Sequence, residues 1–219
     1  MTELVIFGAT TMARLAHAYF TADSPYRVAG FCVDAEYRHG DTFEGLPLVD
    51  AAAVERHFPP SSHHMFVAIG YSRMNALRAQ KYAEAKARGY TLASYVSSRA
   101  TVLTAEPPGD NCFVLEHVAI QPFVRIGRNV IIWSGAVIAH DASVGDHTFI
   151  AAHATILGLC TIGQSCFIGA NATLRDRITV ADRTLVGAGA VLMEDTREAG
   201  VYLPPRATLA PKGSGEIDV

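Results

Sequence analysis

The fold is decided by residues 114–193, which divide into the hexapeptides VLEHVA IQPFVR IGRNVI IWSGAV IAHDAS VGDHTF IAAHAT ILGLCT IGQSCF IGANAT LRDRIT VADRTL VGAGAV and end on LM. The first position of each hexapeptide is Val, Ile or Leu. A period of six fits neither the 3.6-residue turn of an α-helix nor the plain alternation of a strand, and it is typical of a parallel β-helix. We therefore expect stacked coils of short parallel strands.

Small residues occupy most fifth positions of these hexapeptides, as suits side chains crowded at tight corners. If three hexapeptides form one triangular coil, residues i and i+18 stack about 4.8 Å apart, the spacing between neighbouring strands. Cys160 and Cys166 stand at the small-residue position, one hexapeptide apart. Because free cysteine packs well in cores, we expect both thiols to face the interior and to be unreactive.

The residues before the repeat predict an α/β unit. Apolar runs at residues 4–7, 28–33 and 65–69 read as strands, and residues 12–20 and 75–88 have the spacing of helices. Strands that alternate with helices indicate a parallel, Rossmann-like sheet. We expect this domain to cover residues 1–95, the β-helix to cover residues 96–200 and a C-terminal tail to cover residues 201–219.

In parallel sheets, ligands bind at the carboxyl ends of the strands, where helix N-termini offer free N–H groups to phosphate. Only one glycine of a GxGxxG fingerprint follows the first strand, so that glycine also fits a simple chain turn, and the acid after the second strand also fits a helix cap. After the third strand, an aromatic ring and two arginines suit a base and phosphates, or else a solvated helix face. The candidates for binding are Gly8, Thr10, Thr11, Asp34, Gly70, Tyr71, Arg73 and Arg78.

Charge and hydropathy restrict the partners. The 219 residues carry 18 basic and 21 acidic side chains, a net charge of −3, and no basic cluster, which argues against nucleic acid or an anionic membrane surface. The N-terminus does not read as a signal peptide, and no apolar run reaches the ~18 residues of a membrane span. We expect a cytoplasmic protein with a small-molecule ligand.

His140 is the strongest candidate for chemistry on the repeat. It stands next to Asp141, and an imidazole with a near-neutral pKa suits a general base. On a regular coil adjacent side chains point in different directions, so Glu116, of the same or of a neighbouring subunit, is a second candidate for the carboxylate that orients His140. A histidine here also fits an ordinary surface or interface position.

Gly158 follows His140 by eighteen residues, so it is expected one coil away. A glycine there leaves room for a thin acyl-thioester arm, although it also fits a plain corner. A metal is a further alternative, because His117 and His153 share a face two coils apart, hence ~10 Å apart. Two Zn–N bonds of about 2.1 Å cannot bridge that distance within one subunit, so we expect no metal.

Several motifs resemble a known family. The chain is similar, over nearly its whole length, to the hexapeptide-repeat acyltransferases that modify bacterial sugars, a group with sialic acid O-acetyltransferases and N-acetyltransferases of nucleotide-linked 4-amino-sugars. The likeness is specific for architecture and not for the acceptor. The motifs are Val67-Ala-Ile-Gly-Tyr71 with Met74-Asn75 and Arg78, Ile120-Gln-Pro-Phe-Val124, Trp133-Ser-Gly135, His140, Val144-Gly-Asp146 and Phe167-Ile-Gly-Ala-Asn-Ala-Thr173.

The resemblance implies a homotrimer of left-handed β-helices, with acetyl-CoA between neighbouring prisms and the nucleotide on the α/β domain. It implies that His140 is the base, that Asp141 is the acidic residue after it, and that the thioester arm passes Gly158, Ala170 and Ala188. Phe149 stands where amino-sugar enzymes often have a second histidine near acetyl-CoA. His147 and His153 are the candidates to replace that histidine.

We therefore expect an acetyl-CoA-dependent N-acetyltransferase of a UDP- or dTDP-linked 4-amino-sugar in bacterial surface-glycan biosynthesis. His140 would take a proton from the amine as it attacks the thioester, and backbone N–H groups would stabilise the oxyanion. One alternative is O-acetylation of a sialic-acid-like acceptor by the same base. Another is a non-catalytic scaffold that binds a sugar nucleotide.

Overall fold

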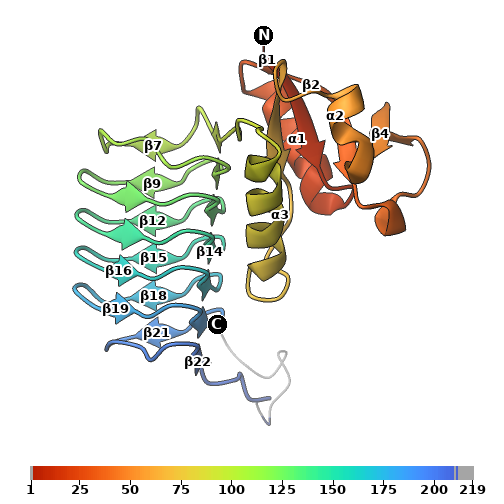
Figure 1. Cartoon of the computed structure of the whole chain (residues 1–219). Helices are drawn as coiled ribbons and strands as arrows, with labels where there is room; N and C mark the ends of the chain where they lie inside the picture. The colour runs from red at the N-terminus through yellow and green to blue at the C-terminus, as the bar shows by residue number, and fades with distance from the viewer. Residues whose placement is uncertain (1, 210, 212–219) are drawn as a thin grey trace.

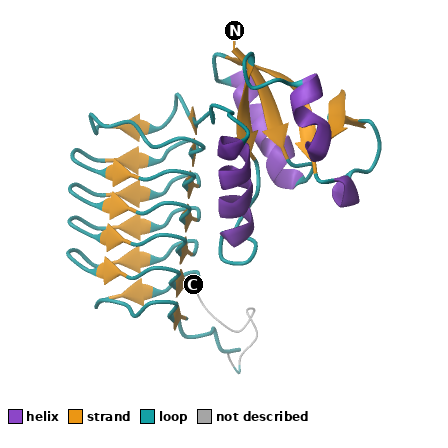
Figure 2. Ribbon diagram, viewed as in Figure 1, coloured by secondary structure: helices purple, strands orange, loops and turns teal. Residues whose placement is uncertain are grey.

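The computed structural model describes residues 2–209 and 211. An α/β domain lies beside a three-faced prism of stacked coils, and helix α3 (Ala76–Ala87) runs along the prism (Figure 1). Helices occur in the N-terminal domain and short strands in the prism (Figure 2). No described helix has both the length and the hydropathy needed to cross a membrane.

The N-terminal sheet has the order β3-β4-β2-β1-β5 and is parallel except for its edge strand β3. The predicted strands and helices are present. The sequence did not predict β3 and β4, because they form a short edge hairpin around Gly45 without a long apolar run. The elements are β1 (Thr2–Phe7), α1 (Thr11–Ala22), β2 (Tyr26–Val33), η1 (Ala35–Tyr37), β3 (Thr42–Phe43), β4 (Leu46–Asp50), η2 (Ala51–Ala53), α2 (Val54–His57), β5 (His63–Val67) and α3.

The alternation of side chains along β1 separates two cores. Leu4 and Ile6 pack with α1 and with the aromatic residues of the prism, including Phe113. Val5 and Phe7 pack on the other side of the sheet with residues of α2 and α3. The N-terminal domain and the prism therefore share one apolar core, which fixes the two domains against each other.

The prism has three parallel faces built from two-residue strands, and each coil of three hexapeptides adds one strand to each face. The first face consists of β6 (Tyr95–Val96), β8 (Phe113–Val114), β11 (Ile131–Ile132), β14 (Phe149–Ile150), β17 (Phe167–Ile168), β20 (Leu185–Val186) and β22 (Val201–Tyr202). The second consists of β7 (Thr101–Val102), β9 (Ala119–Ile120), β12 (Val137–Ile138), β15 (Thr155–Ile156), β18 (Thr173–Leu174) and β21 (Val191–Leu192). The third consists of β10 (Arg125–Ile126), β13 (Ser143–Val144), β16 (Thr161–Ile162) and β19 (Thr179–Val180).

The predicted stacking by eighteen residues is confirmed. Ile132 pairs with Ile150, and Ile138 pairs with Ile156. The aliphatic first positions and the small fifth positions form one continuous interior core. Cys160 and Cys166 lie in that core as free thiols, and burial raises the pKa of Cys166 to about 11, so its thiol is unreactive at neutral pH.

The first face extends beyond the predicted β-helix. Strand β22 (Val201–Tyr202) pairs with β20, although the sequence assigned these residues to the C-terminal tail. The hexapeptide pattern stops at Met193, but the chain returns for one more strand because β20 still offers an unpaired edge. Residues 210 and 212–219 of the predicted tail lie outside the described part of the chain.

Each hexapeptide turns at a corner through one residue in the left-handed backbone region. These residues recur every six positions with φ between 55° and 73°. Glycine, Asn, Asp and His tolerate this conformation better than bulky residues such as Phe123 and Leu159, which also adopt it. The corner residues are Asn111, His117, Phe123, Asn129, Gly135, Asp141, His147, His153, Leu159, Ser165, Asn171, Arg177, Arg183 and Gly189.

Aspartates bind the corners of neighbouring coils together. The Asp146 carboxylate accepts a hydrogen bond of 2.7 Å from the backbone N–H of Arg128. A Cβ atom on Gly127 would lie 2.4 Å from the Asp146 Oδ1 atom, so this close approach requires glycine. Asp182 and Gly163 repeat the arrangement two coils later, where Asp182 binds the N–H of Gln164 at 2.9 Å.

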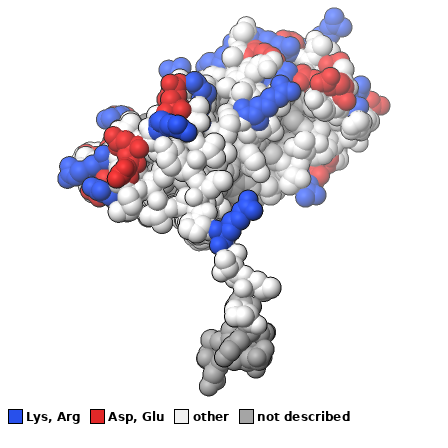
Figure 3. All heavy atoms as spheres, turned by 90° about the horizontal axis from the view of Figure 1, so that it is seen from below, with Lys and Arg blue, Asp and Glu red and all other residues white. Residues whose placement is uncertain are grey.

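On the face seen from below, Lys and Arg side chains lie beside Asp and Glu side chains, and a broad uncharged area lies between the charged groups at the two sides of the view (Figure 3). That face carries no large patch of one sign. Its charge distribution does not resemble the positive footprint of a nucleic-acid-binding surface.

We expect Asp146→Ala to lower the free energy of unfolding by about 1–3 kcal/mol, because it leaves the Arg128 N–H without its charged acceptor. Urea denaturation followed by circular dichroism measures the change. The matched control is Asp176→Ala, since Asp176 is exposed and makes only loose ion pairs with Arg175 and Arg177. An Asp146 variant as stable as this control would contradict the role of the corner aspartates.

Candidate active site

His140 and Asp141 form a hydrogen-bonded pair at the corner between the second and third faces. The His140 Nδ1 atom lies 2.9 Å from Asp141 Oδ2, and the two side chains are 57% and 44% exposed. The backbone N–H of His140 donates to Gln121 Oε1 at 3.0 Å. A carboxylate at Nδ1 places the proton there and leaves the Nε2 lone pair free, as a general base requires.

Gly158 supports the ring of His140, as the stacking by eighteen predicts. A Cβ atom on Gly158 would lie 2.8 Å from both Cε1 and Nε2 of His140. No residue larger than glycine therefore fits beneath the imidazole without displacing it. Within the described residues the Gly158 N–H donates to no protein acceptor, so this amide is available close to His140 Nε2.

The expectation that Asp141 points away from His140 is wrong. Asp141 has φ of 59°, and this left-handed corner turns its carboxylate back toward the preceding imidazole. Glu116, the second candidate, is used within its own subunit. It accepts hydrogen bonds from Tyr19 of α1 at 2.8 Å and from Ser134 at 2.7 Å, on a different corner of the prism from His140.

The Glu116 environment suits an anion that holds two domains together. Burial alone would raise the pKa of Glu116, but the hydrogen bonds from Ser134 and Tyr19 outweigh it and the pKa is lowered. Burial and the hydrogen bond to Glu116 raise the pKa of Tyr19 to about 12, so the phenol stays protonated and donates. Glu116 is therefore a charged acceptor in the domain interface.

A pocket of about 630 Å³ lies at the carboxyl ends of β1, β2 and β5, where the sequence predicts ligand binding. Among the predicted residues it is lined by Gly8, Thr10, Asp34, Gly70 and Arg73. Its volume is that of a typical site for a small ligand.

The N-terminus of α1 opens into this pocket. The N-cap residue Thr10 makes no side-chain capping bond, and the first turn of the helix contains no acidic residue. Free N–H groups and the positive end of the helix dipole therefore face the cavity. Gly8 has φ of 128°, and a Cβ atom there would lie 3.0 Å from the Ala68 carbonyl oxygen, so the turn itself needs glycine.

The sequence did not predict Lys81 of α3 as part of the pocket. Its Nζ atom lies 2.9 Å from carboxylate oxygens of both Asp34 and Glu84, and 5.3 Å from the centre of the Phe7 ring. Burial would lower the pKa of Lys81, but the hydrogen bonds to the two carboxylates outweigh it and the pKa is raised. Helical spacing was the signal that could have indicated Lys81. Leu77 and Lys81 lie on the same side of α3, and both line the pocket.

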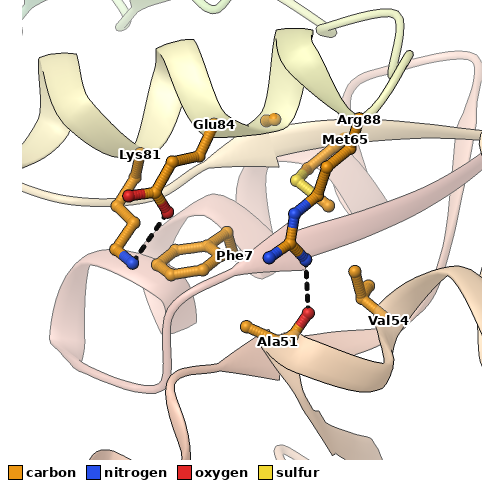
Figure 4. Close-up of a pocket in the computed structure, with 8 residues that line it drawn as sticks. Phe7, Ala51, Val54, Met65, Lys81, Glu84 and Arg88 are labelled. Carbon is orange, nitrogen blue, oxygen red and sulfur yellow. Dashed lines mark hydrogen bonds and ion pairs between the residues drawn. The ribbon is translucent and has the colours of Figure 1, made fainter.

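A narrow cleft lies on the far side of Lys81, between α3 and the segment of η2 and α2. Lys81 and Glu84 point toward one another there, and Arg88 reaches the carbonyl oxygen of Ala51 (Figure 4). The cavity volume is about 10 Å³, which is close to the minimum for one water molecule. This cleft is too small for a substrate.

Three predicted binding residues do not line the pocket. Arg78 was expected to contact phosphate, but it is fully buried and donates to the carbonyl oxygens of Gly70 and His147 at 2.6 and 2.7 Å. That prediction is wrong because the guanidinium has no access to a ligand. Tyr71 packs its ring on Phe149 and Phe167 of the first face, and Thr11 is exposed at the start of α1.

Phe149 and His147, predicted near the cofactor, lie in the domain interface. Phe149 is 5% exposed, and its ring stacks on Phe167 with centroids 5.4 Å apart. The ring of His147 packs edge-on against Tyr82 of α3, and its Nδ1 atom lies 2.8 Å from the Asn129 amide nitrogen. The N-terminal domain covers this side of the prism within one subunit, and the contacts of His147 and Phe149 with a cofactor stay predictions.

His153 is exposed, with its ring on Gly135. A Cβ atom on Gly135 would lie 2.4 Å from the His153 Cε1 atom. Among residues 2–209 and 211, no group of three or more His, Cys, Asp or Glu side chains is arranged to hold a metal ion.

The predicted site residues occupy different corners of one prism. His140 and Gly158 follow the second face, whereas Ala170 and Ala188 stack at the corner that precedes it. The N-terminal domain covers the first face, so the His140 corner lies on the opposite edge, at the left of Figure 1. Within one subunit, His140 and the pocket therefore lie on opposite sides of the first face.

Comparison with known proteins identifies the repeat and the fold. The bacterial transferase hexapeptide family (six repeats) matches residues 109–140 and 159–193. No curated protein sequence matches the chain. Among solved structures, PerB from Caulobacter crescentus, in complex with CoA and GDP-perosamine, is 26% identical, has a TM-score of 0.82 and covers 93% of this chain and 95% of its own.

Two further structures have the same fold. The acetyltransferase domain of PglB from Neisseria gonorrhoeae is 23% identical, with a TM-score of 0.82, and covers 93% of this chain and 97% of its own. WeeI from Acinetobacter baumannii is 17% identical, with a TM-score of 0.78, and covers 92% and 96%. These likenesses confirm the predicted fold class, a Rossmann-like unit followed by a left-handed parallel β-helix. Since the repeat matches the transferase model over these two segments and nearly the whole chain has this two-domain fold, the chain is similar to the hexapeptide-repeat acyltransferases.

Proposed function

We propose that the chain transfers the acetyl group of acetyl-CoA to the amine of a nucleotide-linked amino-sugar in bacterial surface-glycan biosynthesis. The observation that carries the proposal is the His140–Asp141 pair, whose imidazole rests on Gly158 with Nε2 unoccupied by the described residues. The comparison that supports it is a perosamine N-acetyltransferase from Caulobacter crescentus, 25% identical to this chain, whose structure is in complex with CoA and GDP-perosamine.

In this proposal His140 is the base and the N–H of the neighbouring Gly158 is the oxyanion donor. As the amine nitrogen bonds to the thioester carbonyl carbon, His140 Nε2 takes a proton from it, and Asp141 stabilises the imidazolium through Nδ1. The free N–H of Gly158 is the candidate donor to the oxyanion. When the tetrahedral intermediate collapses, the C–S bond breaks and CoA leaves, and the proton on Nε2 is available to the departing thiolate. No acyl-enzyme forms.

The pocket of the N-terminal domain is the proposed site for the nucleotide. The start of α1 and the Arg73 side chain provide N–H groups and a positive charge for the diphosphate. Asp34 and Lys81 lie where they can hydrogen-bond the nucleoside. Tyr71, at the exposed rim of the pocket, stays a candidate for contact with the sugar or the nucleobase.

An amine acceptor is favoured over a sugar hydroxyl by the likeness to the perosamine enzyme. A scaffold without catalysis would have no use for an exposed imidazole oriented by a carboxylate.

We further propose a homotrimer with active sites between subunits, in the cytoplasm, where acetyl-CoA and nucleotide sugars are made. Within one subunit the His140 corner and the nucleotide pocket lie on opposite sides of the prism. A neighbouring subunit would bring its own pocket, and its corner with Ala170 and Ala188, toward His140 and Gly158.

We expect His140→Ala to lower kcat by about 10²–10⁴, because it removes the general base. The assay measures CoA release from acetyl-CoA with UDP-, dTDP- and GDP-linked 4-amino-sugars. The matched control is His57→Ala, because His57 is an exposed histidine of α2 that lines neither the pocket nor a corner of the prism. His140→Ala activity within about tenfold of wild type would contradict the base role.

We expect Gly158→Ala to lower kcat by about 10²-fold, because the new methyl group displaces the His140 ring. A double-mutant cycle tests the mechanism: in the His140→Ala background, Gly158→Ala should cost little more. Equal losses in both backgrounds would show that Gly158 acts independently of His140. Thermal unfolding of each variant controls for loss of structure.

We expect two inactive variants to restore activity when mixed. His140→Ala keeps the pocket, and Arg73→Glu keeps the base, so a site between different subunits can combine the two intact parts. Random assortment after denaturation and refolding of an equimolar mixture should return about a quarter of the wild-type sites. Activity that stays at the level of the separate variants would contradict sites shared between subunits.

A further inference from the structure

Two polar side chains, Asn75 and Arg78, lie completely buried between the rim of the nucleotide pocket and the first face of the prism. The Arg78 guanidinium has no carboxylate partner in the described residues. It donates to the carbonyl oxygens of Gly70 at 2.6 Å, His147 at 2.7 Å and Asn129 at 3.3 Å, and to Asn75 Oδ1 at 2.9 Å. One side chain thus binds the pocket rim and two corners of the prism at once.

The backbone of residues 73–75 is strained. Arg73, Met74 and Asn75 have φ of 52°, 50° and 66°, the one run of three consecutive left-handed residues within the described chain, and none is glycine. Such a turn persists only where surrounding contacts hold it. Arg73 lines the nucleotide pocket, so the strained turn determines where its side chain and the adjoining rim lie.

Asn75 holds this turn against the prism instead of capping a helix. It occupies the N-cap position of α3, where an Asn side chain ordinarily accepts from the first turn, yet it makes no capping bond. Its Nδ2 atom donates to the Cys166 carbonyl oxygen at 3.0 Å, and its Oδ1 atom accepts from Arg78. Both polar atoms of the Asn75 side chain are therefore used in the contact between the domains.

A buried guanidinium without a counter-ion is costly, and an apolar side chain would fill the same volume at less cost. What the guanidinium adds is direction, because its N–H groups form a rigid planar fork that binds several carbonyl oxygens in fixed positions. Arg78 therefore specifies the geometry of the rim relative to the prism.

We propose that Asn75 and Arg78 are positioning residues for the nucleotide pocket: they bind prism carbonyl oxygens and so hold the left-handed turn that presents Arg73 to the diphosphate. The proposal rests on the proposed function of the pocket. It predicts that nucleotide binding depends on an interface that the nucleotide does not touch.

The test compares Asn75→Gly, which keeps the left-handed backbone but loses both amide hydrogen bonds, with Arg78→Met and Arg78→Lys. Calorimetry measures the Kd of UDP, dTDP and GDP, and kinetics measure KM for acetyl-CoA and for the sugar nucleotide. The matched control is Tyr19→Phe, which removes a hydrogen bond across the same domain interface, to Glu116, away from the rim. Thermal unfolding confirms that each variant is folded at the assay temperature.

We expect Asn75→Gly and Arg78→Met to weaken nucleotide binding by about tenfold or more and to leave KM for acetyl-CoA within about twofold. Arg78→Lys should fall between Arg78→Met and wild type, because it keeps the charge without the fork. Tyr19→Phe should lower thermal stability and leave nucleotide affinity unchanged. If the Asn75 and Arg78 variants bind nucleotide as tightly as Tyr19→Phe does, the positioning role is wrong. A wild-type chain that binds none of UDP, dTDP and GDP would instead overturn the proposed function itself.

Discussion

The structure depends on one backbone constraint: every hexapeptide must make its turn with a single residue in the left-handed region, so that strands eighteen residues apart remain in register. Each strand is only two residues long, and such a strand has no stability of its own. The stacked hydrogen bonds and the continuous aliphatic core supply it. A misplaced corner would shift all later side chains relative to the coil before them.

The register explains why residues far apart in the sequence come into contact and why the size of one side chain restricts the other. His140 has room because residue 158 has no side chain, and Asp146 reaches the Arg128 amide because residue 127 has none. Neither glycine has a positive φ, so their role is to leave space and not to supply backbone freedom. In a coiled fold of this kind, a functional side chain thus finds its place because the residue one coil away is a glycine without a Cβ atom.

Much of this was predictable, because a period of six fixes which residues stack. The core positions, the buried thiols and the Gly158–His140 contact follow from the sequence alone. The direction of corner side chains does not, since it depends on which residue adopts positive φ, and for that reason the contact of Asp141 with His140 was missed. The contacts of the residues between the domains could not be predicted, because their partners come from the other domain; these residues are Glu116, His147, Phe149 and Arg78. No local pattern marks an exposed helix arginine as one that another domain will bury.

The placement of the N-terminal domain has a consequence for catalysis. It occupies the first face through a shared apolar core and a buried guanidinium, so it has no freedom to swing around the prism toward His140. A β-helix is itself stiff, because bending it would break ladders on all three faces. Neither domain movement nor prism bending can unite the pocket with the base. The proposed trimer would unite them by assembly of separate subunits, and the rigidity that fixes each half of the proposed site would make such an assembled site well defined.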